Sequence, residues 1–244
     1  MAHDLFNPDL PRLLGPSNLP AGLMGRKKSQ ADAHRIIAIE GPIGVGKTTL
    51  AHALTERLNA RLVEEDIGGN PFIKEFYADP GRTAFQTQMF FLLSRYQQQL
   101  QLRQGDLFAH TTVADYMFQK DRIFAHLTLG EAELALYERI YTLLDPRIPK
   151  PDLVVYLQAR ADVLLDRIRS RSRSWERPIT LDYLERVNRA YNDYFFHYSG
   201  GSLLVINTSD IDIVEKEAHL EEVISAVRRM KKGVQHYNPF VTKR

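Results

Sequence analysis

With 244 residues the chain can bury one sizeable α/β core, and its 44% hydrophobic and 25% charged residues are ordinary for a globular protein. A net charge of only +2 argues against a protein that binds nucleic acid over its whole surface. The sequence contains no cysteine, which excludes disulfides and thiolate metal sites, and no apolar run approaches the roughly 18 residues that cross a bilayer. We therefore expect a soluble, cytoplasmic protein.

Residues 1–34 show no hydrophobic periodicity and are interrupted by prolines and glycines, Pro8 and Pro16 among them. Asp4 and Asp9 argue against a transit peptide, because such peptides are poor in acidic residues. We expect a disordered N-terminal extension.

A phosphate-binding loop is predicted next, between a short apolar run and a helical pattern. The pattern Gly-x4-Gly-Lys-Thr occupies residues 41–48, and Leu50, Leu54 and Leu58 follow at helical spacing. Glycines let backbone N–H groups turn toward phosphate oxygens, the lysine reaches the β- and γ-phosphates, and the threonine hydroxyl ligates magnesium. The predicted site for ATP and Mg²⁺ comprises Gly41, Pro42, Ile43, Gly44, Val45, Gly46, Lys47, Thr48 and Thr49.

The remaining pattern predicts a doubly wound α/β fold. Short apolar runs alternate with helical stretches, and long crossovers between strands are typical of a parallel sheet covered by helices on both faces. The five predicted strands are residues 36–39, 61–63, 111–114, 153–157 and 203–206. Such sheets bind ligands at the carboxyl ends of their strands, so Glu64, Glu65 and Asp115 are candidate site residues.

An arginine-rich segment, RIRSRSRSWERP at residues 167–178, lies between two predicted helices. Five arginines in so short a segment repel one another, and solvent, RNA or the phosphates of a nucleotide are the candidates that would neutralise them. A small kinase needs arginines that close over the transferring phosphoryl group. The sequence lacks the Asn/Thr-Lys-x-Asp guanine reader of a GTPase, which favours the interpretation of this segment as a kinase lid.

Five stretches, in order and spacing, make residues 35–229 resemble the deoxynucleoside kinases, particularly their bacterial deoxyadenosine/deoxyguanosine kinase branch. The stretches are the phosphate loop, EEDIGGNPFIKEFYADP, FYADPGRTAFQTQMFFLLSRY, TTVADYMFQKDRIFA and the arginine-rich segment. The resemblance implies a P-loop kinase fold at residues 35–230, with a five-stranded parallel sheet and an arginine-rich lid, and it leaves residues 231–244 as a C-terminal tail. It also implies a homodimer that acts on a small molecule and binds neither nucleic acid nor membranes.

The resemblance assigns the catalytic groups as well. Glu65 would accept the proton of the 5′-hydroxyl as general base, with Glu64 as the alternative one residue earlier. Beside Lys47, the lid arginines that meet the phosphates would be Arg167, Arg171 and Arg173.

The same resemblance implies a nucleoside pocket. Tyr77 and Glu176 would hold the sugar 3′-hydroxyl. Gln88 would read the base edge, and Arg95 would complete the base pocket with Asp121 as its partner. Gln88 and Arg95 are seven residues apart and therefore share one face of a predicted helix. A glutamine amide can donate and accept at once, which suits a nucleobase edge.

One departure from the family pattern concerns the end of the third strand. Asp115 keeps the acidic residue expected near magnesium or the phosphates, and Thr48 would be the other metal ligand. The arginine that follows the acid in the family is replaced by Tyr116. Arg122, Lys120 or a lid arginine are the candidates for its substitute.

These residues together predict ATP-dependent phosphorylation of the 5′-hydroxyl of a deoxynucleoside, purine preferred, in nucleotide salvage. One alternative is a nucleoside monophosphate kinase similar to thymidylate kinase, although a carboxylate at Glu65 would repel the phosphate of its acceptor. The other is a nucleotide-regulated RNA-binding module that uses the arginine-rich segment, which predicts salt-sensitive RNA affinity without turnover.

Overall fold

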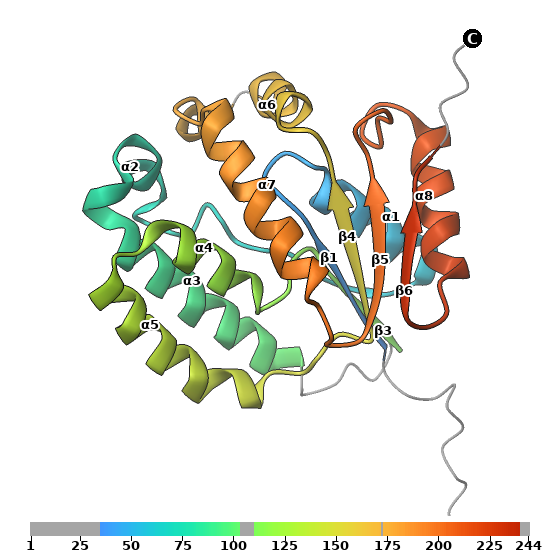
Figure 1. Cartoon of the computed structure of the whole chain (residues 1–244). Coiled ribbons are helices and arrows are strands. Elements are labelled where there is room, and N and C mark those ends of the chain that lie inside the picture. The colour runs from blue at the N-terminus through green and yellow to red at the C-terminus, as the bar shows by residue number, and fades with distance from the viewer. Residues whose placement is uncertain (1–34, 103–109, 172, 240–244) are drawn as a thin grey trace, which may run out of the picture. The chain divides into compact units, whose positions relative to one another are not determined.

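A parallel sheet organises the part of the chain that the computed structural model describes, residues 35–102, 110–171 and 173–239 (Figure 1). The predicted N-terminal extension lies outside the described residues. The strand order is β2-β3-β1-β4-β5-β6, and every neighbouring pair is parallel. The strands are β1 Arg35–Glu40, β2 Arg61–Val63, β3 Thr111–Ala114, β4 Leu153–Gln158, β5 Ser202–Asn207 and β6 Val234–Tyr237. The predicted parallel α/β fold is confirmed, and β1 to β5 match the predicted strands to within one residue at each end.

The sheet is one strand wider than we predicted. β6 pairs with β5 from Val234 beside Leu203 to Tyr237 beside Ile206, so part of the expected C-terminal tail belongs to the sheet. The first three side chains of β6, in the sequence VQHY, are exposed. Main-chain hydrogen bonds at the sheet edge hold such a strand, so it needs no apolar run that a sequence pattern would reveal.

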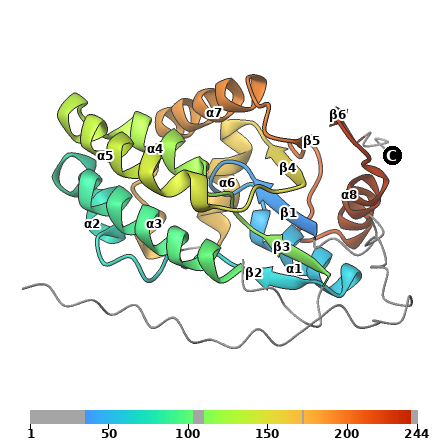
Figure 2. The ribbon, with the colours of Figure 1, turned by 90° about the horizontal axis from the view of Figure 1, so that it is seen from below.

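Helices cover both faces of the sheet (Figure 1 and Figure 2). α1 and α8 lie on one face, α4 and α7 on the other, and α3 and α5 pack beside α4. The helices are α1 Lys47–Leu58, α2 Ile73–Ala78, α3 Pro80–Leu102, α4 Lys120–Thr128, α5 Glu131–Leu144, α6 Ala161–Ser170, α7 Leu181–Phe196 and α8 Glu217–Arg229, with short 3₁₀ helices η2 Asp145–Arg147 and η3 Ser174–Glu176. None of these elements of the described chain has both the length and the apolar composition that crossing a membrane requires.

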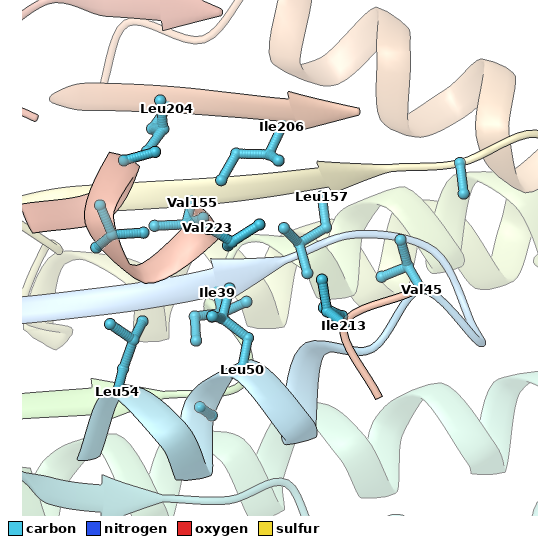
Figure 3. Close-up of a cluster of buried hydrophobic side chains, with 14 of the residues drawn as sticks. Ile39, Val45, Leu50, Leu54, Val155, Leu157, Leu204, Ile206, Ile213 and Val223 are labelled. Carbon is cyan, nitrogen blue, oxygen red and sulfur yellow. The ribbon is translucent and has the colours of Figure 1, made fainter. Parts of the chain in front are cut away.

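The two-residue repeat of the strands divides the core into two layers. Along β4, Val155 and Leu157 point toward the face of α1, where they pack with Leu50 (Figure 3). Tyr156 points to the opposite face and packs with Tyr191 of α7, with 6.1 Å between ring centroids. A strand buried on both faces must be apolar at consecutive positions, which is the reason why the runs were recognisable in the sequence.

Candidate active site

A cavity of about 540 Å³ opens at the carboxyl ends of β1, β2 and β3 and is walled by the phosphate loop, α2, α3, α6 and α7. It collects predicted site residues from five separate stretches of the chain. Outside the phosphate loop, the predicted residues on its wall are Glu65, Tyr77, Gln88, Arg95, Asp115, Arg167, Arg171, Arg173 and Glu176. Asp121 does not line the cavity, because it lies fully buried behind Arg95. A concave pocket with convergent polar groups is the usual form of a small-molecule site.

The phosphate loop has the backbone that its glycines permit. Gly41 has φ +152°, and a Cβ there would lie 2.4 Å from the carbonyl oxygen of Leu157. Gly46 precedes the first turn of α1 with φ +102°, in the left-handed region that favours glycine. The Lys47 ammonium donates to the carbonyl oxygens of Gly41 at 2.8 Å and Pro42 at 3.2 Å, so it folds back over the loop.

Glu40, the last residue of β1, is a site residue that sequence reasoning missed. Its carboxylate is completely buried and accepts hydrogen bonds from Gly41 N at 3.0 Å, Met117 N at 2.8 Å and the Tyr191 hydroxyl at 3.2 Å. Burial raises the pKa of Glu40, against the opposing charge of nearby Lys120. The side chain ties the start of the phosphate loop to α7 and to the segment after β3. An acidic residue at the end of a buried strand is the signal in the sequence that could have identified Glu40.

Thr48 and Asp115 bring two hard oxygen donors together. The Thr48 hydroxyl donates to Asp115 Oδ2 at 2.7 Å, and Asp115 Oδ1 accepts from the backbone N–H of Glu65 at 2.8 Å. The described residues contain no group of three or more His, Cys, Asp or Glu side chains that would form a metal cage of their own. A pair of oxygen ligands fits Mg²⁺, which keeps several waters and shares nucleotide phosphates.

Glu65 lies at the centre of a buried ion cluster. Lys120 Nζ donates to its Oε2 at 2.6 Å, and Arg95 Nε donates to its Oε1 at 2.8 Å. The side chains of Glu65, Arg95 and Lys120 are 6%, 5% and 5% exposed. Burial alone raises the pKa of a carboxyl group, but the charges of Arg95 and Lys120 outweigh it and hold the pKa of Glu65 well below its usual range.

Glu64, the alternative to Glu65, has different surroundings. Its carboxylate is about half exposed and pairs with His52 at 3.0 Å, and it does not line the cavity. Of the two neighbouring carboxylates, Glu65 is the one that faces the cavity.

The polar wall contributed by α3 has unused hydrogen-bonding capacity. Gln88 is 2% exposed and donates from Nε2 to the Thr128 hydroxyl at 3.2 Å. Among the described residues, neither Gln88 Oε1 nor Asp121 Oδ2 has a hydrogen-bond partner although both atoms are buried. The Arg95 guanidinium lies over the Phe91 ring, 4.6 Å from its centroid, and Phe91 lines the cavity. Buried polar atoms without partners are rare in proteins, and of Gln88 and Asp121 it is Gln88 that lines the cavity, where its oxygen is available to a ligand.

The lid arginines contact protein groups. Arg167, in the last turn of α6, donates to the carbonyl oxygens of Thr208 at 2.8 Å and Ile211 at 2.7 Å. Arg171 makes two hydrogen bonds with the buried carboxylate of Glu176, at 2.7 and 2.6 Å. The predicted phosphate ligand Arg171 and the predicted sugar ligand Glu176 are therefore partners of each other.

Trp175, which had no assigned role, docks the lid. It packs against the apolar cluster of Ile73, Phe76 and Phe91 on α2 and α3. Arg173 lies 6.0 Å from the Trp175 ring and 3.9 Å from Glu176, with a half-exposed side chain. The lid thus lies against α2, and Arg167, Arg171 and Arg173 line the cavity.

Comparison with known proteins shows the family of the chain. The family model of deoxynucleoside kinase matches residues 37–232. The chain belongs to the deoxynucleoside kinase family. Membership makes the protein a kinase, and the match runs from the third residue of β1 past the end of α8.

Named relatives of this kinase match over most of their length. The deoxyguanosine kinase of Bacillus subtilis is 34% identical over 203 residues, 80% of this chain and 96% of that protein. The deoxyadenosine kinase of Dictyostelium discoideum is 32% identical over 228 residues, 91% of this chain and 89% of that protein. The solved structure of deoxyadenosine kinase from M. mycoides, with products dCMP and a flexible dCDP bound, has a TM-score of 0.70 at 23% identity. It covers 80% of this kinase and all of that chain, and the likeness shows the fold.

The phosphate loop generates a pH-dependent prediction for ATP binding. Burial lowers the pKa of Lys47 to about 8, and nearby Lys120 acts in the same direction. Above pH 8 the free kinase therefore loses the charge that attracts phosphate, and affinity for a fluorescent ATP analogue should weaken about tenfold by about pH 9. The control is Lys47→Arg, whose guanidinium stays charged, so its affinity should be flat over the same range. Equal pH dependence of the two proteins would contradict the assignment to Lys47.

Proposed function

We propose that this kinase transfers the γ-phosphoryl group of ATP to the 5′-hydroxyl of a purine deoxynucleoside in nucleotide salvage. The observation that carries the proposal is the position of Glu65, a buried carboxylate in one cavity between the phosphate loop and the polar wall of Gln88 and Arg95. The relatives named deoxyguanosine kinase and deoxyadenosine kinase support the choice of acceptor.

The surroundings of Glu65 favour a nucleoside over a nucleoside monophosphate as acceptor. A monophosphate kinase must offer basic groups to the acceptor's own phosphate. Here Arg95 is bonded to two buried carboxylates, those of Glu65 and Asp121, and Lys120 is bonded to Glu65. An acceptor phosphate would have to displace these carboxylates against their repulsion.

The contacts of the lid argue against the RNA-binding alternative. Arg167 and Arg171 are bonded to groups of the protein and line the cavity. A nucleic-acid surface would instead present arginines outward as an exposed basic face.

In the proposed reaction, Glu65 accepts the proton of the 5′-hydroxyl as that oxygen bonds to the γ-phosphorus. The bond from the γ-phosphorus to the bridging oxygen breaks, and ADP leaves with that electron pair. Lys47 and the lid arginines Arg167, Arg171 and Arg173 neutralise the charge on the phosphoryl oxygens, which requires Arg171 to leave Glu176. Glu176 and Tyr77, both on the cavity wall, then hold the sugar 3′-hydroxyl.

Thr48 and Asp115 would hold the Mg²⁺ ion that accompanies the nucleotide. When bound, this ion neutralises charge on the β- and γ-phosphates. The phosphate loop, residues 41–49, supplies the backbone donors that orient the same phosphates.

We assign the preference for a purine nucleobase to the part of the cavity wall that α3 forms. Gln88 Oε1 needs a donor, which the exocyclic amine of adenine or guanine offers. Arg95, backed by Asp121, narrows the same region and would crowd the 5-methyl group of thymine. Deoxycytidine, which has an amine and no methyl group, would be tolerated.

We also propose a cytoplasmic homodimer whose catalytic domain is residues 35–230, extended by β6. Large apolar side chains remain exposed on α3 and α5, Leu93 at 47% and Leu143 at 72%, and they offer surface for a second copy.

The proposed function makes a first prediction about Glu65 as the general base. Glu65→Gln should leave binding of ATP nearly intact and lower kcat by at least about 10², because the amide no longer accepts the proton. Glu64→Gln is the matched control and should turn over like the wild type, since Glu64 faces solvent beside His52. Steady-state assays with deoxyguanosine decide the matter. A dead Glu64→Gln beside an active Glu65→Gln would place the base one residue earlier.

The second prediction concerns the acceptor. Deoxyadenosine or deoxyguanosine should have kcat/KM values at least about tenfold above that of thymidine, because a mismatched ligand leaves buried polar groups unpaired. The double variant Arg95→Met, Asp121→Ala should raise the ratio of thymidine to purine activity, whatever its overall rate. The measurement is kcat/KM for the four deoxynucleosides in both proteins. Thymidine as the best substrate of the wild type would contradict the pocket assignment.

A further inference from the structure

Lys120 is the cation of the site whose role the family pattern does not supply. It begins α4, its side chain is 5% exposed, and its Nζ lies 2.6 Å from Glu65 Oε2. It lines the cavity, while its neighbour Asp121 is buried behind Arg95. Burying an ammonium group is expensive unless a carboxylate pairs with it. Glu65 provides that carboxylate.

The other candidates for the missing arginine lie elsewhere. Arg122 is about half exposed and bonds to Glu138 at 2.9 Å on α5. The lid arginines Arg167 and Arg171 are bonded to carbonyl groups and to Glu176. Among these candidates, Lys120 is the one bonded to Glu65.

Tyr116, which replaces the family's arginine, lies near both cations. Its ring is completely buried, with its centroid 5.9 Å from the Arg95 guanidinium and 5.9 Å from Lys120 Nζ. Its hydroxyl donates to Gln98 Oε1 at 2.7 Å. The tyrosine thus borders both cations and supplies no positive charge itself.

We propose that Lys120 is a positioning residue of the transfer reaction, which holds the Glu65 carboxylate through Oε2 and leaves Oε1 for the 5′-hydroxyl. This inference rests on the proposed function, since it deepens the role of Glu65. Arg95 occupies Oε1 in the structure and also bonds Asp121, so it can turn toward Asp121 and the base when the acceptor enters. Lys120, on the other oxygen, keeps the carboxylate in place throughout.

The charge balance of the site explains why this cation is needed. Carboxylates from the ends of three strands and from α4 meet there, and the cations that face them come from the phosphate loop, α3 and α4. The carboxylates are Glu40, Glu65, Asp115 and Asp121, the cations are Lys47, Arg95 and Lys120, and the phenols nearest to Glu65 are Tyr77, Tyr116 and Tyr191. Without Lys120, four carboxylates would face two cations, and Glu65 Oε2 would lose the hydrogen bond that Lys120 donates to it.

The test compares Lys120→Met with Lys120→Arg and with a matched control, Arg122→Met, on the exposed face of the same helix. Methionine keeps much of the side-chain volume and removes the charge. Lys120→Met should lower kcat by about tenfold or more and leave KM for the deoxynucleoside within about twofold, because the carboxylate is no longer held toward the 5′-hydroxyl. Lys120→Arg should remain within about fivefold of wild-type kcat, and Arg122→Met within about twofold.

A second readout is independent of turnover. In crystal structures of the free proteins, the Glu65 carboxylate should keep its wild-type orientation in Lys120→Arg and lose it in Lys120→Met, because only the methionine variant lacks the hydrogen bond to Oε2. A wild type that transfers no phosphoryl group would refute the proposed function, while these structures would still decide whether Lys120 positions Glu65. An unchanged Glu65 carboxylate together with wild-type kcat in Lys120→Met would overturn the inference, and so would equal losses of kcat in the methionine and arginine variants.

Discussion

A carboxylate buried as deeply as Glu65 must be paired, and the arrangement of the site depends on how this pairing is made. One oxygen takes Arg95 from α3 and the other takes Lys120 from α4, so two helices are tied to the end of β2 through one side chain. Removing one partner of such a buried cluster leaves an uncompensated charge and typically costs about 3–5 kcal/mol. The cluster therefore specifies where α3 and α4 lie relative to the sheet, and with them the cavity wall.

The topology of the sheet explains why so much negative charge meets there. β2, β3 and β1 are neighbours, and parallel strands end at the same edge. Glu65, Asp115 and Glu40 follow or end these strands, and the phosphate loop begins directly after Glu40. Lys47 of the loop, Arg95 of α3 and Lys120 of α4 offset most of this negative charge before a nucleotide binds. In the proposed reaction, an incoming phosphate is received by the loop and the lid, while Glu65 stays directed at the acceptor.

The parts of the structure that local patterns encode could be predicted from the sequence. The phosphate loop follows from glycine spacing, and β1 to β5 follow from apolar runs, because a strand buried on both faces must be continuously apolar. β6 could not be found, since three of its four side chains are exposed and its backbone pairing leaves no apolar run. The pairing of Lys120 with Glu65, 55 residues apart, and that of Arg171 with Glu176 depend on how helices pack, which no local periodicity records.

The most direct test of the account is a double-mutant cycle between Glu65 and Lys120 in the single-turnover rate of phosphoryl transfer. If Lys120 acts through Glu65, then Glu65→Gln with Lys120→Met should transfer at the rate of Glu65→Gln alone, within about twofold, because residues that act as a unit are not additive. Rate losses that multiply in the double variant would contradict the account, because Lys120 would then act on the phosphoryl group independently of the carboxylate.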